Sequence, residues 1–229
     1  GWAEAILRSA HELKAGLQAF QAEQSGRLRI AASFTIAEYL LPQWLGRFAR
    51  AHPGDSVALE VANSTSVIER LRDGGADLGF IETTSSLPDL EEQLVGTDEL
   101  IAVVGPTHPW AKRRTVPVEA LAATPLVTRE AGSGTREALE DALAALDLGP
   151  PTAVLELGST SAVRSAVLDA NSPTVISRLA VAAELETGSL VEIEVKDLAI
   201  TRSLRAVWPH RQPLPPLAAQ LLDSLGLSA

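Results

Sequence analysis

Between residues 27 and 81 the chain alternates short apolar strands with amphipathic helices, and this order constrains the fold more than any other feature. Apolar side chains occupy every second position in residues 28–32 and 57–61, and residues 77–81 form a short apolar run; all three are typical of strands. The two segments between them carry apolar side chains at helical spacing. Strand, helix, strand, helix, strand is the order of a parallel α/β sheet, so we expect one here.

A second strand-and-helix series begins after the polar segment 83–86, which we interpret as a candidate hinge. Its predicted strands are residues 100–104, 126–128, 154–157, 174–177 and 190–195, and its predicted helices are residues 118–122, 136–146, 162–170 and 179–185. A strand at residues 204–208 and a leucine-rich final helix then return the chain to its first part.

We therefore predict an α/β protein with two Rossmann-like lobes joined by two crossover strands. Lobe I is predicted as residues 26–84 plus 204–229, and lobe II as residues 85–203. A cleft between such lobes, where strand ends and helix starts converge, is the expected ligand site.

The N-terminal segment predicts a dimerising helix. From Ala3 to Phe20 the apolar side chains recur at alternating spacings of three and four, which is the seam of a coiled coil. Residues 1–25 are therefore predicted as a linker helix that pairs with a partner helix. The sequence begins with Gly1 and contains no Met, so we expect it to be a piece of a longer product.

Composition excludes several classes of function. A formal charge of −10 argues against this chain itself gripping a nucleic-acid backbone, because Lys and Arg supply that affinity. The absence of cysteine excludes disulfides, thiolate catalysis and Cys-ligated metals. The apolar runs are too short to span a bilayer, so no membrane partner is expected.

Residues with catalytic chemistry are present but not arranged as a recognisable site. His52 and His108 each precede a proline, and neither histidine is paired with a nucleophile by any known motif. A Gly-x-Ser-x-Gly elbow and metal-ligand spacing are both missing. We therefore predict that the chain is not an enzyme and holds no metal and no cofactor.

Small polar residues follow the predicted strands of lobe I, where hydroxyl and backbone N–H groups suit an anion. The candidate ligand residues are Ser33 and Thr35 after the first strand, and Asn63, Ser64 and Ser66 after the second. Helix capping alone is the alternative for each of them, and Ser66 has the spacing of a capping box with Glu69.

Lobe II carries a similar turn. Gly132-Ser133-Gly134-Thr135 precedes a helix and resembles a backbone nest for an anion, although it lacks the Lys of a nucleotide-binding P-loop. Ser133 and Thr135 are therefore candidate ligand residues, and Arg129 is a candidate source of positive charge. The alternative for Arg129, and for Arg136 on the other side of the turn, is a solvated arginine. Two weaker candidates are Ser159–Ser161, interpreted as a helix cap, and Ser177 beyond a buried strand.

Six segments carry a family resemblance when their order and spacing are taken together. They are residues 26–30, 39–42, 48–54, 63–64, 71–79 and 104–109. In this order they resemble the linker helix and effector-binding domain of a LysR-type transcriptional regulator, and the resemblance covers essentially residues 1–225. The segments 33–35 and 129–136 look most similar to members that control sulfur assimilation or carbon fixation.

The resemblance implies a fold like that of type 2 periplasmic solute-binding proteins, with a small anionic effector bound between the lobes. It also implies a cytoplasmic homodimer or homotetramer that contacts DNA through an N-terminal domain absent from this sequence. One segment departs from the family pattern, because Asp169–Ser177 stands where such domains have a Gly-rich turn. Asn171 can adopt the left-handed conformation that glycine would supply there.

Two other classes remain open at this point. A periplasmic solute-binding protein for a small anion has the same lobes but delivers its ligand to a transporter. An enzyme on this fold, such as a relative of prephenate dehydratase or porphobilinogen deaminase, would need catalytic residues that the sequence does not display.

Overall fold

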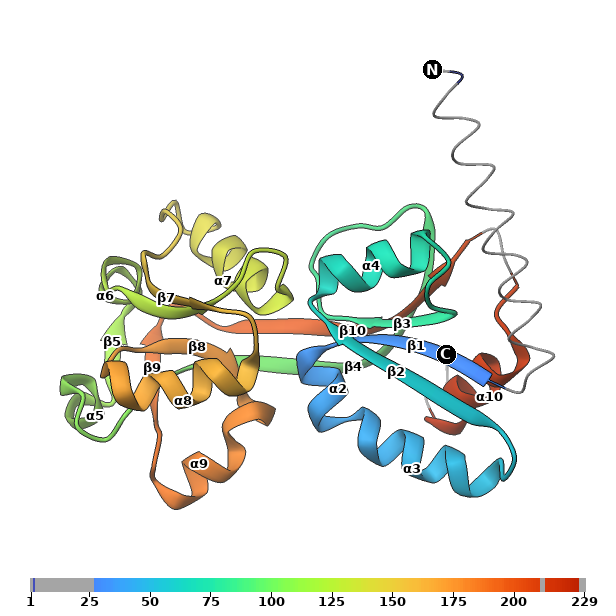
Figure 1. Cartoon of the computed structure of the whole chain (residues 1–229). Coiled ribbons are helices and arrows are strands. Elements are labelled where there is room, and N and C mark those ends of the chain that lie inside the picture. Colours follow the sequence, from blue (N-terminus) through green and yellow to red (C-terminus); the bar gives the residue numbers. More distant parts are fainter. Residues whose placement is uncertain (1, 3–26, 211–212, 227–229) are drawn as a thin grey trace. The chain divides into compact units, whose positions relative to one another are not determined.

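The computed structural model describes residues 2, 27–210 and 213–226 (Figure 1). The predicted linker helix and its coiled-coil seam, residues 1–25, therefore lie outside the described residues apart from residue 2. The described chain forms two compact units. Unit 1 takes in residues 27–81, 85–96 and the described residues from 204 onward, and unit 2 takes in residues 82–84 and 97–203.

The strands, in chain order, are β1 (Arg27–Ser33), β2 (Ser56–Ala62), β3 (Leu78–Ile81), β4 (Leu90–Val104), β5 (Thr115–Pro117), β6 (Leu126–Arg129), β7 (Ala153–Leu157), β8 (Thr174–Ser177), β9 (Val191–Lys196) and β10 (Ile200–Pro209). The helices are α2 (Phe34–Tyr39), α3 (Leu41–Ala51), α4 (Ser64–Arg72), α5 (Pro109–Arg113), α6 (Val118–Ala123), α7 (Gly134–Ala144), α8 (Thr160–Ala170), the 3-10 helix η1 (Arg178–Val181), α9 (Ala182–Thr187) and α10 (Pro216–Ser224).

Unit 1 is built on a sheet in the order β2-β1-β3-β10. Strand β1 pairs in parallel with both β2 and β3, which confirms the parallel sheet predicted for this part of the chain, and β10 runs antiparallel to β3. Helices cover both faces. Leu28, Ile30 and Ala32 of β1 lie in the core formed with α2, α3 and α10, whereas Ala31 lies in the core beneath α4.

Unit 2 is built around β4, which pairs antiparallel with β8 and β9, while β9 pairs in parallel with β5. A separate parallel pair, β6 and β7, carries α7 and α8 after its two strands. The core collects apolar side chains from β4 and β9 together with α5, α6 and α7, among them Trp110, Leu121, Leu139 and Leu143.

Two long strands belong to both units. Strand β4 lies in unit 1 up to Gly96 and in unit 2 from Thr97 onward, and β10 lies in unit 2 up to Ser203 and in unit 1 from Leu204 onward. The prediction of two α/β lobes joined by two crossover strands is thereby confirmed. The boundaries differ from the predicted ones, because residues 85–96 pack in unit 1 and residues 82–84 in unit 2.

Several predicted elements need correction. Strand β4 begins at Leu90 rather than at residue 100, because its first half lacks the regular alternation of a strand: Leu90 and Val95 are buried five residues apart, and the residues between them are exposed or half-buried. Strand β10 begins at Ile200 rather than at residue 204, the predicted helix 179–185 is η1 followed by α9, and the short elements α5 and β5 were not predicted.

Two local features of the backbone concern helix ends. Pro42 lies in the first turn of α3, where its fixed φ is compatible with a new helix start. Asn171 ends α8 with φ 46° and ψ 39°, the left-handed conformation predicted for this position. A search of the described helices finds none of sufficient length and hydrophobicity to span a bilayer.

Candidate functional site

In unit 1 two helix starts meet at one edge of the parallel sheet. Strands β1 and β2 run side by side with Ser33 opposite Ala62, so α2 and α4, which follow these strands directly, begin next to each other. The register therefore brings the predicted ligand residues Ser33 and Thr35 to the same edge as Asn63 and Ser64, with Ser66 in the first turn of α4.

The hydroxyls at this edge are buried. Ser33 is 2 % exposed, Thr35 is 0 % exposed and Ser64 is 1 % exposed. Ser33 precedes α2 but makes no side-chain capping hydrogen bond to it. Helix capping, which is the alternative to ligand binding, therefore does not explain the hydroxyl of Ser33.

Asn63 has the capping role instead. Its side-chain oxygen accepts a hydrogen bond of 2.9 Å from the backbone N–H of Ser66, and α4 begins at Ser64. The predicted capping box of Ser66 with Glu69 is wrong, because the extended backbone needed for a cap occurs at Asn63, three residues earlier.

Unit 2 repeats this arrangement on the β6–β7 pair. Arg129 at the end of β6 lies opposite Leu157 at the end of β7, so α7 and α8 begin at the same edge. The predicted ligand residues Ser133 and Thr135 are 2 % and 5 % exposed at the start of α7. Gly132 has φ 82°, the left-handed conformation that a backbone nest requires.

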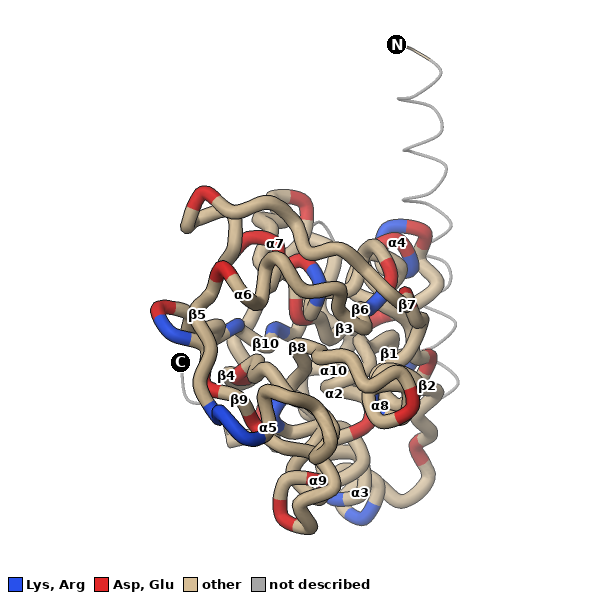
Figure 2. The backbone as a smooth tube through the Cα atoms, turned by 90° about the vertical axis from the view of Figure 1, so that its left-hand side faces the viewer, with Lys and Arg blue, Asp and Glu red and all other residues tan. Residues whose placement is uncertain are grey.

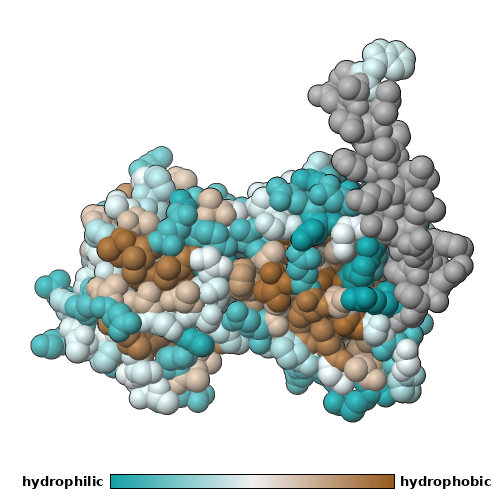
Figure 3. All heavy atoms as spheres, in the orientation of Figure 1, coloured by the Kyte–Doolittle hydropathy of each residue, from teal (hydrophilic) through white to brown (hydrophobic). Residues whose placement is uncertain are grey.

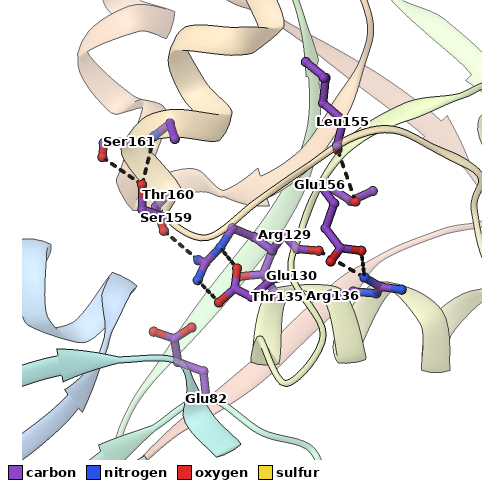
Figure 4. Close-up of polar contacts among 12 residues, drawn as sticks. Glu82, Arg129, Glu130, Thr135, Arg136, Leu155, Glu156, Ser159, Thr160 and Ser161 are labelled. Atoms are coloured by element: carbon purple, nitrogen blue, oxygen red, sulfur yellow. Dashed lines mark hydrogen bonds and ion pairs between the residues drawn. The ribbon is translucent and has the colours of Figure 1, made fainter. Parts of the chain in front are cut away.

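Arg129 is buried rather than solvated, and its charge is paired (Figure 4). Its Nε and Nη2 donate to the two carboxylate oxygens of Glu130 at 2.8 and 2.9 Å. Its Nη1 donates to the hydroxyl of Thr160 at 3.0 Å. On the other side of the turn, Arg136 pairs with Glu140 and Glu156 near the surface.

A buried ionic cluster in unit 2 was not predicted. Arg202 has a fully buried side chain, and its guanidinium lies 2.7 Å from a carboxylate oxygen of Glu82 and 2.7 Å from one of Asp98. Its Nη1 also donates to the Thr135 hydroxyl at 3.0 Å. The other oxygen of Asp98 accepts from the hydroxyl of Ser177 at 2.8 Å, so Ser177 supports this cluster.

Burial raises the pKa of Asp98 above its ordinary value, and the attraction of Arg202 together with hydrogen bonds from Arg202 and Ser177 opposes that shift. A cluster of two carboxylates and one guanidinium is costly to bury, so each member depends on the others.

The sequence did hold a signal for this cluster. Asp98 alternates with Leu100 and Ala102 along β4, and Arg202 lies between Ile200 and Leu204 along β10. A charged residue in the inward-facing register of a strand has to find a buried partner. Ser159, in contrast, caps α8 by accepting from the N–H of Ala162, as predicted.

Acidic residues outnumber basic residues in the sequence, 29 against 19. Along the described backbone the two kinds are interspersed, and the longest basic run is residues 112–114 at the end of α5 (Figure 2). Among the residues that the structure describes, no group of three or more His, Asp or Glu side chains is placed to hold a metal ion.

Comparison with known proteins identifies the family. Residues 21–227 match the model of the LysR substrate binding domain. The chain belongs to the LysR family. The HTH-type transcriptional regulator Rv2282c of Mycobacterium tuberculosis is 43 % identical to this LysR chain over 216 residues, which are 90 % of this chain and 69 % of the relative. YeiE of Escherichia coli K12, also an HTH-type transcriptional regulator, is 35 % identical over 210 residues, 91 % of this chain and 69 % of YeiE.

Solved structures agree with this assignment of the LysR chain. The regulatory domain of Synechocystis PCC6803 CcmR, in complex with 2-PG, superposes with a TM-score of 0.78 at 27 % identity, covering 87 % of this chain and 95 % of that one. These relatives are regulators, so the chain is the ligand-sensing region of a LysR-type transcriptional regulator rather than a solute receptor that serves a transporter.

Proposed function

We propose that this LysR region senses a small anionic metabolite and thereby controls transcription by the regulator to which it belongs. The edge of unit 1 carries this proposal. Two adjacent helix starts bring three buried hydroxyl residues to this edge, namely Ser33, Thr35 and Ser64. The side-chain amide of Asn63, which caps α4, lies at the same edge. Hydroxyl hydrogens and helix N-terminal N–H groups are the donors that an oxyanion accepts.

The proposed ligand residues of unit 2 are Ser133 and Thr135, with Arg129 beside them. Their placement at the start of α7, after a left-handed Gly132, supports a second group of donors. The prediction that one effector engages both lobes stays a prediction.

In the intact regulator, DNA contact would belong to the N-terminal domain that the family resemblance implies, and the names of the relatives, which are HTH-type transcriptional regulators, support a helix-turn-helix there. The acidic balance of this chain supports that division of roles, because phosphate backbones attract basic surfaces. The protein would then act in the cytoplasm as a homodimer or homotetramer, with no membrane partner and no catalytic activity.

Exposed apolar edges support the oligomer. Strand β2 ends the sheet of unit 1 and exposes Leu59 and Val61, and β7 in unit 2 exposes Val154 and Leu155. Hydrophobic residues are visible on the face drawn in Figure 3 over both units. Unpaired apolar strand edges favour association with another chain.

The proposed function is tested by thermal unfolding with a panel of anions: sulfate, phosphorylated metabolites including 2-PG, and aromatic acids. A ligand at 100 times its dissociation constant adds about 2.7 kcal/mol, which raises Tm by roughly 5–10 °C for a domain of this size. Thr35→Val should weaken the binding of whichever anion raises the Tm of the wild type. Thr35→Ser keeps the hydroxyl and should bind that anion like the wild type. Equal binding by both variants, or no response to any anion, would contradict the proposal.

A further inference from the structure

Two buried threonines in unit 2 share an unusual environment. Thr135 and Thr160 lie in the first turns of α7 and α8 and are 5 % and 2 % exposed. Each hydroxyl oxygen accepts a hydrogen bond of 3.0 Å from an arginine, Thr135 from Arg202 and Thr160 from Arg129. Figure 4 shows the second of these contacts, with Arg129 reaching from the end of β6 to the start of α8.

The arginine determines which way each hydroxyl can act. A threonine hydroxyl has one hydrogen, and a guanidinium can only donate, so the hydrogen must point away from the arginine. Within the described chain, the only side-chain hydrogen bonds of Thr135 and Thr160 are those that they accept. Each therefore keeps one buried donor without a protein acceptor, at the start of an 11-residue helix.

The two arginines do not bring net positive charge to these helix starts. Arg129 is held by both oxygens of Glu130, and Arg202 is held by Asp98 and Glu82. Three carboxylates thus face two guanidinium groups. An anion near α7 would gain hydrogen bonds from hydroxyls but no net charge attraction from this cluster.

We propose that Arg202 and Arg129 are positioning residues, which turn the hydroxyl hydrogens of Thr135 and Thr160 toward the effector. This inference rests on the proposed function. It adds that the part of the effector that meets unit 2 presents hydrogen-bond acceptors without hydrogens of their own, as a fully deprotonated oxyanion does. A protonated phosphate, which must also donate, fits this donor set less well.

A water molecule is the competing partner for the hydrogen of Thr135. A small cavity of about 10 Å³ is lined by Arg129, Thr135 and Arg136 among others, which is room for about one water molecule. A water that takes the hydrogen of Thr135 would explain the geometry without an effector, and the experiments below separate the two.

The first experiment is an NMR titration of the 229-residue chain with inorganic sulfate, read from the backbone amides at the starts of α7 and α8. Sulfate should shift these amides, and Thr135→Val should weaken the binding by about tenfold or more, because a hydrogen bond to a charged group is lost. Thr135→Ser should bind like the wild type. Thr187→Val, at an exposed threonine of α9, is the control and should have no effect.

The second experiment separates positioning from charge. The variant Glu82→Gln with Asp98→Asn and Arg202→Met removes one positive and two negative charges, so net charge alone predicts tighter sulfate binding. Positioning predicts the opposite, a loss of about the same size as in Thr135→Val, with no further loss when Thr135→Val is added. Unfolding curves measured without ligand establish that each variant is folded. The comparison of Thr135→Val with Thr135→Ser remains valid even if the triple variant does not fold.

Each result bears on one claim only. Tighter sulfate binding by the cluster variant, or absent sulfate shifts at α7 and α8 in the wild type, would overturn the positioning roles. If none of the anions tested shifts the backbone amide signals at the starts of α2 and α4, that result would count instead against the proposed function of unit 1. A preference for the singly protonated over the fully deprotonated form of a phosphate monoester, measured at one pH below and one pH above its second pKa of about 6, would also overturn the inference.

Discussion

Gly134 shows at the scale of one residue how closely the start of α7 is packed. A Cβ atom built on this glycine would lie 2.6 Å from the backbone carbonyl oxygen of Glu82. That contact is with backbone, so no side chain can swing away to relieve it. The close approach holds the start of α7 against the segment that carries Glu82 into the buried ionic cluster.

Gly134→Ala should therefore destabilise the protein although alanine is the better helix former. Overpacking of this kind costs about 1–3 kcal/mol, which urea unfolding would measure as a lower midpoint. Gly158→Ala is the matched control, because a Cβ there meets nothing within 4 Å. Equal midpoints for the two variants would show that the contact with Glu82 yields without cost.

At the scale of one element, α4 depends on Asn63 at its N-terminus. The Asn63 side chain satisfies the N–H of Ser66, one of the donors that a helix start leaves without a partner. Asn63→Ala should lower the free energy of unfolding by about 1 kcal/mol, whereas Asn63→Asp keeps a capping oxygen and should cost little. Urea unfolding of the two variants measures the difference.

The same pair of variants tests the ligand role of this position. Asn63→Asp places a negative charge beside Ser64, so it should weaken an anion bound at this edge while leaving the helix stable. A variant that is as stable as the wild type and binds sulfate equally well would limit Asn63 to capping.

Helix α5 introduces a pH dependence. His108 caps it, and Nδ1 of the neutral imidazole accepts from the N–H of Trp110 at 3.2 Å. Burial lowers the pKa of His108 from its ordinary value of 6.5. The unfolded chain therefore binds a proton more readily than the folded one, so the contribution of His108 is complete above pH 6.5 and is lost as the pH falls through the folded pKa.

His108→Asn retains a capping oxygen but does not titrate. The loss of stability on lowering the pH from about 7.5 to 5.5 should thus be smaller in His108→Asn than in the wild type. Unfolding free energies measured at both pH values test this, and parallel curves for the two proteins would exclude His108 as the source.

At the scale of the whole molecule, the elements that could be predicted are those in which apolar side chains recur at the spacing of a helix or a strand. Strands β1 and β2 and helices α4, α7 and α8 have apolar side chains at the spacing of their own structure, and polar turns mark where they begin. The candidate residues Ser33, Thr35 and Ser133 were found through those turns. Arg202 was missed because its partner Asp98 lies 104 positions away, on another strand. The inward-facing register of each strand marks Asp98 and Arg202 as buried, but a local pattern does not show that these two distant residues pair.

This cluster also joins three segments that continue from unit 2 into unit 1. Glu82 directly follows Ile81, Asp98 lies two residues after Gly96, and Arg202 lies two residues before Leu204. Arg178 makes a chemically similar cluster with Glu99 and Glu192, but its side chain is 40 % exposed. The two arginines thus offer a comparison in which burial is the main difference.

Arg202→Met should lower the free energy of unfolding by about 3–5 kcal/mol, because it leaves Asp98 and Glu82 buried without a counter-ion. Arg178→Met should cost about 1 kcal/mol or less, since water solvates the carboxylates that it releases. The deficit of Arg202→Met should also shrink as the pH falls, because burial already raises the pKa of Asp98 and loss of the guanidinium removes the attraction that opposes this shift. Unfolding curves for both variants at two pH values decide the matter: similar, pH-independent losses would mean that the Arg202 cluster contributes no more than a surface ion pair.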